Sequence, residues 1–298
     1  MGKRLAVFLG VTFGLSWTTW AIASVITGAV TQGVSASASM IVVVAVSMFF
    51  PLVGAFAANA VAPKERRIDF GVRPRIRGNG RFYVLAWLMP AVLTLIGGAL
   101  FFLVFPQLFD RDATQLRSAL EASGVPADQL GLIVMGQLLA AVTVGPLINT
   151  IPSLGEEVGW RGMLLPLLCE RMSERRAVIA SGIIWGLWHA PIIAMGHNYG
   201  MGYPGFPVTG ILTMVVACTS IGCLLSWLRL RSGSVWPCAV AHGAINAITN
   251  AGILLCTAGA TLYGPSVLGL VAGIPTMLLA VFCWLRLSDQ AGDTTPSA

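Results

Sequence analysis

Residues 129–169 read QLGLIVMGQLLAAVTVGPLINTIPSLGEEVGWRGMLLPLLC, two apolar segments that flank a polar break and a group of charges. The segments cover 129–150 and 154–169, and the charges follow in Gly-Glu-Glu-Val-Gly-Trp-Arg at 155–161. An ionised side chain at membrane depth costs several kcal/mol unless it is paired or hydrated, so such residues are functional candidates. We therefore expect the rest of the chain to be organised around this stretch.

The composition of the whole chain is that of a multi-pass membrane protein. Its 298 residues are 56% hydrophobic and only 10% charged, with a mean hydropathy of +0.81, whereas charged residues make up about a quarter of a soluble domain. The net charge of +6 comes from Lys and Arg in short loops, which is typical of cytoplasmic loops and gives no reason to expect a nucleic-acid partner. The six cysteines are scattered without a CxxC pair, so we expect them to be buried as small hydrophobic residues.

Apolar runs of membrane-spanning length predict an all-α bundle of about eight transmembrane helices. The predicted spans are 5–26, 40–62, 82–105, 129–172, 177–195, 207–228, 235–255 and 262–285. The uncharged or mixed-charge connections predict outer loops at 28–38, 107–128, 196–206 and 256–261, with a short surface helix near 112–122. We expect His197, in Gly196-His-Asn-Tyr-Gly of the loop 196–206, to be exposed.

The basic loops predict which side of the membrane each segment faces. The loop from Lys64 to Arg81 is the most basic part of the chain and should be cytoplasmic, with both termini on the same side. The basic turn at 170–176 reaches that side only if 129–172 makes one net crossing. We therefore predict a broken helix, interrupted near Pro146 to Pro152 and lining a cavity ahead of Glu156, because backbone breaks at membrane depth require one.

Two further polar motifs follow at the same predicted depth. They are Trp185-Gly-Leu-Trp-His189 and His242-Gly-Ala-Ile-Asn246. At 1.5 Å per residue, Glu156, His189 and the His242–Asn246 pair all lie roughly 15 to 20 Å from the basic side. Each motif also has a purely structural interpretation: Glu156 as a helix cap, Glu157 with Arg161 as an ion pair, and the histidines as interhelical hydrogen bonders. A shared depth favours one site over independent contacts.

Small residues recur at a spacing of four beside both histidines, as Ala239, Gly243, Ala247 and Ala251 and as Gly182, Gly186 and Ala190. Such stripes allow helix backbones to approach closely in lipid. The polar residues then carry the chemistry of amide hydrolysis. A buried carboxylate at Glu156, beside His189, deprotonates water, and His242 with Asn246 donates hydrogen bonds to the developing oxyanion. GxSxG and HExxH are absent, which leaves a metal-free route and a divalent metal such as zinc on Glu156, His189 and His242 both open.

The order EExxxR, an aromatic-x3-His and Hx3N resembles the CPBP family of intramembrane proteases. This family is also called the CAAX protease and bacteriocin-processing (Abi) family, and it includes the Rce1-type prenyl-protein endopeptidases. The resemblance implies that Glu156 activates water, with Glu157 and Arg161 supporting it. It further implies that His189 is the partner of Glu156, and that His242 and Asn246 stabilise the oxyanion. Trp185 stands where the family commonly has Phe, and metalloprotease is a frequent description of the family.

The sequence divides the chain into N-terminal transmembrane helices with a basic loop (1–128), a CAAX-protease-like membrane core (129–286) and a disordered tail (287–298). The family resemblance covers roughly residues 145–255. It implies a multi-pass protein of the cell membrane that cuts a peptide or protein substrate, lipidated or not, near the cytoplasmic face, in contact with membrane lipids. The alternative is a transporter or an interaction or immunity protein that uses the same cavity. A transporter should carry an internal repeat with paired broken helices, and we find one break and no convincing repeat.

Overall fold

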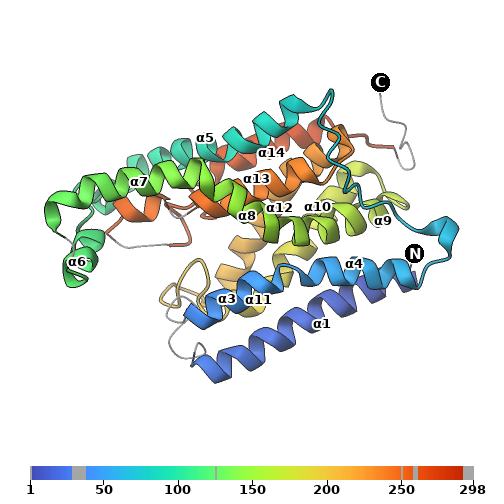
Figure 1. Ribbon diagram of the computed structural model, residues 1–298, viewed down its shortest axis with the longest axis horizontal. Coiled ribbons are helices and arrows are strands. Elements are labelled where there is room, and N and C mark those ends of the chain that lie inside the picture. The colour runs from blue at the N-terminus through green and yellow to red at the C-terminus, as the bar shows by residue number, and fades with distance from the viewer. Residues whose placement is uncertain (1, 29–37, 125, 250, 258–260, 291–298) are drawn as a thin grey trace.

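The computed structural model describes residues 2–28, 38–124, 126–249, 251–257 and 261–290. Within these ranges the chain is a bundle of helices without a β-strand, as predicted (Figure 1). Residues 29–37, 258–260 and 291–298 lie outside the described residues. They include most of the predicted loop 28–38, part of the predicted loop 256–261 and most of the predicted tail. All six cysteines are described, and each is buried, as expected.

Long apolar helices account for most of the predicted membrane spans. By length and composition five helices could cross a membrane, or six if one bent pair counts as a single span. The five are α1 (Gly2–Thr27), α3 with α4 (Ala38–Ser47 and Phe50–Ala60), α5 (Gly80–Val104), α12 (Val208–Ser232) and α13 (Trp236–Ile248) with the 3₁₀ turn Ala251–Leu255. The other two predicted spans contain the shorter helices α10 (Glu174–Trp188) and α14 (Ile274–Leu285). The count of eight crossings therefore stays a prediction.

The remaining helices are short. They are α6 (Thr114–Ala122), which is the predicted surface helix, α7 (Leu130–Val142), α8 (Val144–Glu157), a π-helical segment η5 (Val158–Leu164), α9 (Leu165–Cys169) and α11 (Ala190–Ile193). One-turn 3₁₀ helices cover Lys64–Arg66, Pro106–Leu108 and Ala127–Gln129.

The broken helix exists, but its break lies earlier than predicted. The segments 131–142 and 144–169 meet at an angle of 45°, so the bend is at Thr143 and not between Pro146 and Pro152, and Pro152 lies inside α8. Proline lacks an N–H and its ring collides with the carbonyl four residues earlier. Pro146 therefore leaves the Val142 carbonyl free, and that oxygen accepts a hydrogen bond from the Trp87 indole at 2.8 Å. The bend lies before Pro146 because the helical hydrogen bond that a proline removes is the one to the carbonyl four residues earlier.

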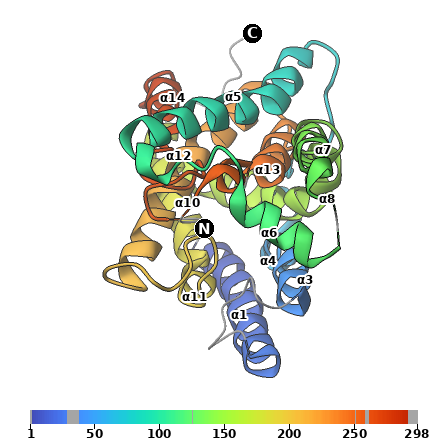
Figure 2. The same ribbon diagram turned by 90° about the vertical axis from the view of Figure 1, so that its left-hand side faces the viewer.

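The helices pack in three groups (Figures 1 and 2). α1 packs against α3 and α4 on one side of the molecule, whereas α5 packs against α13 and α14 on the opposite side. Between them lie α8, which packs on α13, and α10, which packs on α12. The three predicted polar motifs are on α8 with η5, on α10 and on α13, so all of them belong to this central region.

The small-residue stripes lie at the closest helix contacts. A Cβ added at Gly243 would come within 2.6 Å of the Thr150 backbone nitrogen on α8, and one at Gly186 within 2.5 Å of the Val215 Cα on α12. Real Cβ atoms do not approach a backbone so closely. The predicted close approach is therefore confirmed, and it brings the helices of His242 and Glu156 into direct contact.

The variant Gly243→Ala should be less stable than the parent by about 1 to 3 kcal/mol, because overpacking of a tight contact forces the backbones apart. The matched control is Gly136→Ala on α7, where an added Cβ meets nothing within 4 Å, and where the helix preference of Ala should stabilise slightly. Thermal unfolding of both purified variants in the same detergent tests this. Equal melting temperatures for the two variants would contradict the assigned contact.

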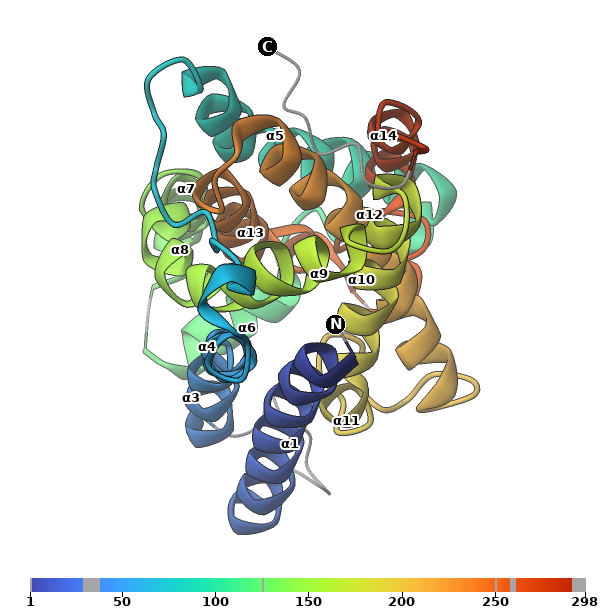
Figure 3. The same ribbon diagram turned by 90° about the vertical axis from the view of Figure 1, so that its right-hand side faces the viewer.

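Basic residues join several segments at one end of the bundle, which Figure 3 views directly. Arg4 at the start of α1 donates to Glu170 at 2.7 Å and to the Arg66 carbonyl at 2.9 Å. Arg231 at the end of α12 donates to the Arg286 carbonyl at 2.8 Å. This end, called the basic end below, therefore gathers the starts of α1 and α5, the turn between α9 and α10, and the ends of α12 and α14.

Candidate active site

One pocket of about 320 Å³ contains all four predicted catalytic residues in its wall. Glu156, His189 and His242 are buried, with 3%, 9% and 5% of their surfaces exposed, and Asn246 is exposed. Trp185 also lines the pocket. Three separate helices thus bring the predicted residues to one cavity inside the bundle.

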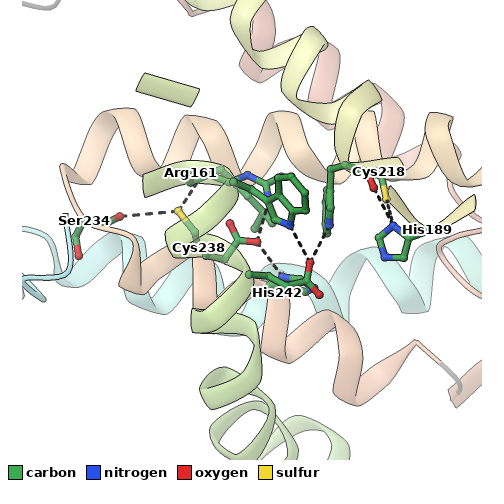
Figure 4. A network of polar contacts seen from close by, with 11 residues as sticks. Arg161, His189, Cys218, Ser234, Cys238 and His242 are labelled. Atoms are coloured by element: carbon green, nitrogen blue, oxygen red, sulfur yellow. Dashed lines mark hydrogen bonds and ion pairs between the residues drawn. The ribbon is translucent and has the colours of Figure 1, made fainter. Parts of the chain in front are cut away.

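Glu156 is held by two indole groups at the end of α8. Its Oε2 accepts hydrogen bonds from Trp160 Nε1 at 3.0 Å and from Trp185 Nε1 at 2.9 Å (Figure 4). Among the described residues no hydrogen-bond partner of Oε1 is found, so this oxygen is the one left for a ligand in the pocket. The two indoles fix the orientation of the carboxylate without neutralising it.

The role of the tryptophans was not predicted from the sequence. Trp185 stands where the family commonly has Phe, but a Phe at this position would lack the N–H that donates to Glu156. Trp160 was not singled out, although its position four residues after Glu156 places the two side chains on the same helix face. That spacing was the available signal.

Glu157 links Arg161 to His242. Its Oε1 accepts from Arg161 Nη1 at 2.8 Å and lies 2.9 Å from His242 Nδ1 (Figure 4). Both Glu157 and Arg161 are fully buried, and the Arg161 guanidinium lies 4.4 Å from the centre of the Trp185 ring. Among the described residues Arg161 Nε and Nη2 have no hydrogen-bond acceptor, and a contact with an aromatic ring stabilises such a desolvated cation. Because a carboxylate accepts, His242 Nδ1 carries a proton, and Nε2 is the nitrogen left for a substrate.

His189 ends α10 and is oriented by the helix itself. Its Nδ1 lies 2.9 Å from the Trp185 carbonyl oxygen and 3.8 Å from Cys218 Sγ. A carbonyl only accepts hydrogen bonds, so Nδ1 carries the proton and Nε2 is left as an acceptor. This assignment makes His189 suited to orient a water molecule.

The structure pairs the acidic and imidazole groups differently from the expectation. Neither histidine forms a hydrogen bond with Glu156 among the described residues, and His242 is paired with Glu157 instead. His197, expected to be exposed, is half-buried and lines the pocket with Asn198. The loop after α11 folds back toward the bundle, where the His197 amide donates to the Ile192 carbonyl at 2.9 Å. The loop sequence has no hydrophobic periodicity, so the burial of His197 could not be predicted from it.

A metal ion fits these side chains poorly. Within the described part of the chain, no three His, Cys, Asp or Glu side chains lie close enough together to hold a metal ion, and this includes Glu156, His189 and His242. The description metalloprotease is therefore not supported.

Comparisons with known proteins agree with the motif pattern. Residues 137–248 match the sequence model of the family described as Type II CAAX prenyl endopeptidase Rce1-like. The "CAAX prenyl protease 2" of Methanococcus maripaludis is 30% identical over 118 residues, which are 39% of this chain and 43% of the relative. The chain therefore matches less than half of that relative's length. The resemblance to CPBP-type proteases is confirmed for this region, which includes every predicted site residue from Glu156 to Asn246.

Proposed function

With residues 137–248 carrying the Rce1-like match, we propose that this chain is an intramembrane endopeptidase that hydrolyses a peptide bond with a water molecule activated by Glu156. The observation that carries the proposal is the geometry of Glu156. Two indole donors hold one oxygen of its carboxylate, and the side chain lies in the same pocket wall as His189, His242 and Asn246. A preorganised carboxylate of this kind is suited to general base catalysis.

The first step is attack by water. Glu156 takes a proton from a water molecule that His189 Nε2 orients by accepting its other hydrogen. The water oxygen forms a bond to the carbonyl carbon of the substrate, and the carbonyl electron pair moves onto oxygen. The Asn246 amide and the Nε2–H of His242 donate hydrogen bonds to that oxyanion, which is where preorganised donors have their largest effect. This role requires His242 to carry a proton on both ring nitrogens, with Nδ1–H paired to the Glu157 carboxylate.

The second step breaks the peptide bond. Protonated Glu156 gives its proton to the amide nitrogen, the C–N bond breaks, and the oxyanion re-forms a carbonyl. The products are a carboxylic acid, which keeps the second proton of the water molecule, and an amine, and Glu156 regains its starting charge. Glu157 acts through His242, because its carboxylate holds the ring by Nδ1, and Arg161 holds Glu157 in turn.

The substrate we propose is a peptide or protein with an apolar side chain next to the cleaved bond. Apolar residues make up most of the remaining pocket wall, among them Ile41, Val44, Ile192, Met214 and Ile221. A prenylated tail is one precedent, since the archaeal relative is named a CAAX prenyl protease. An unmodified peptide with an apolar side chain next to the cleaved bond is compatible with the same apolar wall.

The variant His242→Ala should cleave peptides about 10² to 10³ times more slowly than the parent, because it removes one oxyanion donor. The measurement uses purified protein with a panel of prenylated and unmodified peptides, and mass spectrometry of the products. The control is Arg117→Ala, a change at an exposed residue of α6 that does not line the pocket. An unchanged rate in His242→Ala would overturn the assigned role, and absence of cleavage of every peptide by the parent protein would favour a non-enzymatic role of the pocket.

A further inference from the structure

The helices α10, α12 and α13 line the pocket mainly with the half that is remote from the basic end. From α12 the lining residues are Met214, Cys218 and Ile221, and none comes from the last eleven residues before Gly233. The lining residues of α13 begin at His242, six positions after its start at Trp236. At 1.5 Å per residue, the pocket floor is about 10 to 16 Å from the basic end.

The same asymmetry holds for the other walls. α10 begins at Glu174 but lines the pocket only from Trp185 onward. The second predicted span contributes four residues between Ile41 and Met48 and none from α4, which leads to the basic loop. The remaining lining residues include His197 and Leu268, which lie in connections remote from the basic end.

Between the pocket and the basic end the bundle is closed. Trp160, Arg161, Met163 and Leu164 on the π-helical segment have 0% exposed surface. On the other side of Glu156 and His242 the wall becomes accessible, since Asn246, one turn beyond His242, is exposed. The pocket is therefore closed by buried side chains on the side of the basic end and is accessible on the side of Asn246, so its mouth faces away from the basic end.

Charge assigns the two ends to the two sides of the membrane. Of the 18 Lys and Arg residues, all but Arg111, Arg117 and Arg161 belong to segments at the basic end. Short loops rich in Lys and Arg stay in the cytoplasm. The opposite end carries the loop 105–128, in which acidic residues outnumber basic ones.

We infer that the active-site pocket receives its substrate from the extracytoplasmic side of the membrane. This inference rests on the proposed function, whose substrate it narrows to peptides or protein segments exposed on that side. It differs from the expectation of cleavage near the cytoplasmic face. A cytoplasmic protein tail would have to pass a layer of fully buried side chains to reach Glu156.

Labelling of single cysteines in intact cells tests the direction of the pocket. His197→Cys places a thiol in the pocket wall, and Ile76→Cys places one in the basic loop, where Ile76 is 64% exposed. Both variants also carry Cys218→Ala, because Cys218 lines the pocket, and the parent with Cys218→Ala gives the background. The probe is a membrane-impermeant maleimide, applied before and after the cells are permeabilised.

We expect His197→Cys to react in intact cells and Ile76→Cys to react only after permeabilisation. Reaction of His197→Cys only after permeabilisation would overturn the inference. Labelling needs no catalytic activity, so its result is separate from that of the proposed function. A second measurement adds peptide outside proteoliposomes of known orientation: cleavage only when the basic end faces inward supports the inference, and cleavage only in the reverse orientation contradicts it.

Discussion

Glu156→Gln is expected to reduce peptide cleavage by about 10² to 10⁴, the usual contribution of a general base. The amide keeps the shape of the side chain and one oxygen that still accepts from Trp160 and Trp185. It cannot take a proton from water, so the loss should appear in kcat and much less in KM. Single-turnover cleavage of a labelled peptide by purified protein measures this directly.

The control for this experiment is Glu121→Gln, the same chemical change at an exposed position of α6. It should leave both the rate and the melting temperature unchanged. The melting temperature of Glu156→Gln also serves as a check that the bundle is intact. Cleavage by Glu156→Gln at the parental rate, with the protein folded, would sink the proposed mechanism, although another residue of the pocket could still carry a hydrolytic function.

Arg161→Met is expected to lower the free energy of unfolding by about 3 to 5 kcal/mol, the cost of leaving one member of a buried ion pair without its partner. Arg161 and Glu157 are both fully buried at 2.8 Å, so water cannot replace the lost contact. The stacking of the guanidinium on Trp185 at 4.4 Å would be lost as well. Denaturation in mixed detergents, followed by tryptophan fluorescence, gives the difference from the parent.

The matched control for Arg161→Met is Arg4→Met at the basic end. Arg4 forms an ion pair with Glu170 whose N–O distance of 2.7 Å is close to the 2.8 Å of the Arg161–Glu157 pair. There the Glu170 side chain is 40% exposed, and a pair of this kind contributes at most about 1 kcal/mol. Adding Glu157→Gln to Arg161→Met should recover part of the loss, because the unpaired buried charge disappears. Equal destabilisation by Arg161→Met and Arg4→Met would show that burial of the pair does not govern its energy.

Much of the site could be predicted because its motifs depend on local spacing. Glu157 and Arg161 are four residues apart on one helix, as are His242 and Asn246, so their shared faces follow from helix geometry. The common depth of Glu156, His189 and His242 follows from the rise per residue and the position of the basic loops. All of these residues line one pocket in the structure, apart from Glu157 and Arg161, which support it from behind.

Pairing across helices could not be read in the same way. His242 contacts Glu157 and not Glu156, although the two acids are adjacent in the sequence. Both acids lie at the end of α8, and which of them faces α13 depends on the rotation of α8 about its own axis, which is set by its packing on α13. The same reason explains why the donation from Trp185 on α10 to Glu156 on α8 was missed.

The amino-acid sequence by itself determined that the chain is a helical membrane bundle, because hydrocarbon tolerates long apolar runs only as helices that satisfy their own backbone. It also determined which polar residues lie inside the bundle, because their depth follows from chain distance to the charged loops. Only the tertiary structure decided where the broken helix bends, which acid each imidazole contacts, and toward which end the pocket opens. Those features depend on the rotation and packing of neighbouring helices, which contacts between distant residues set and no local pattern encodes.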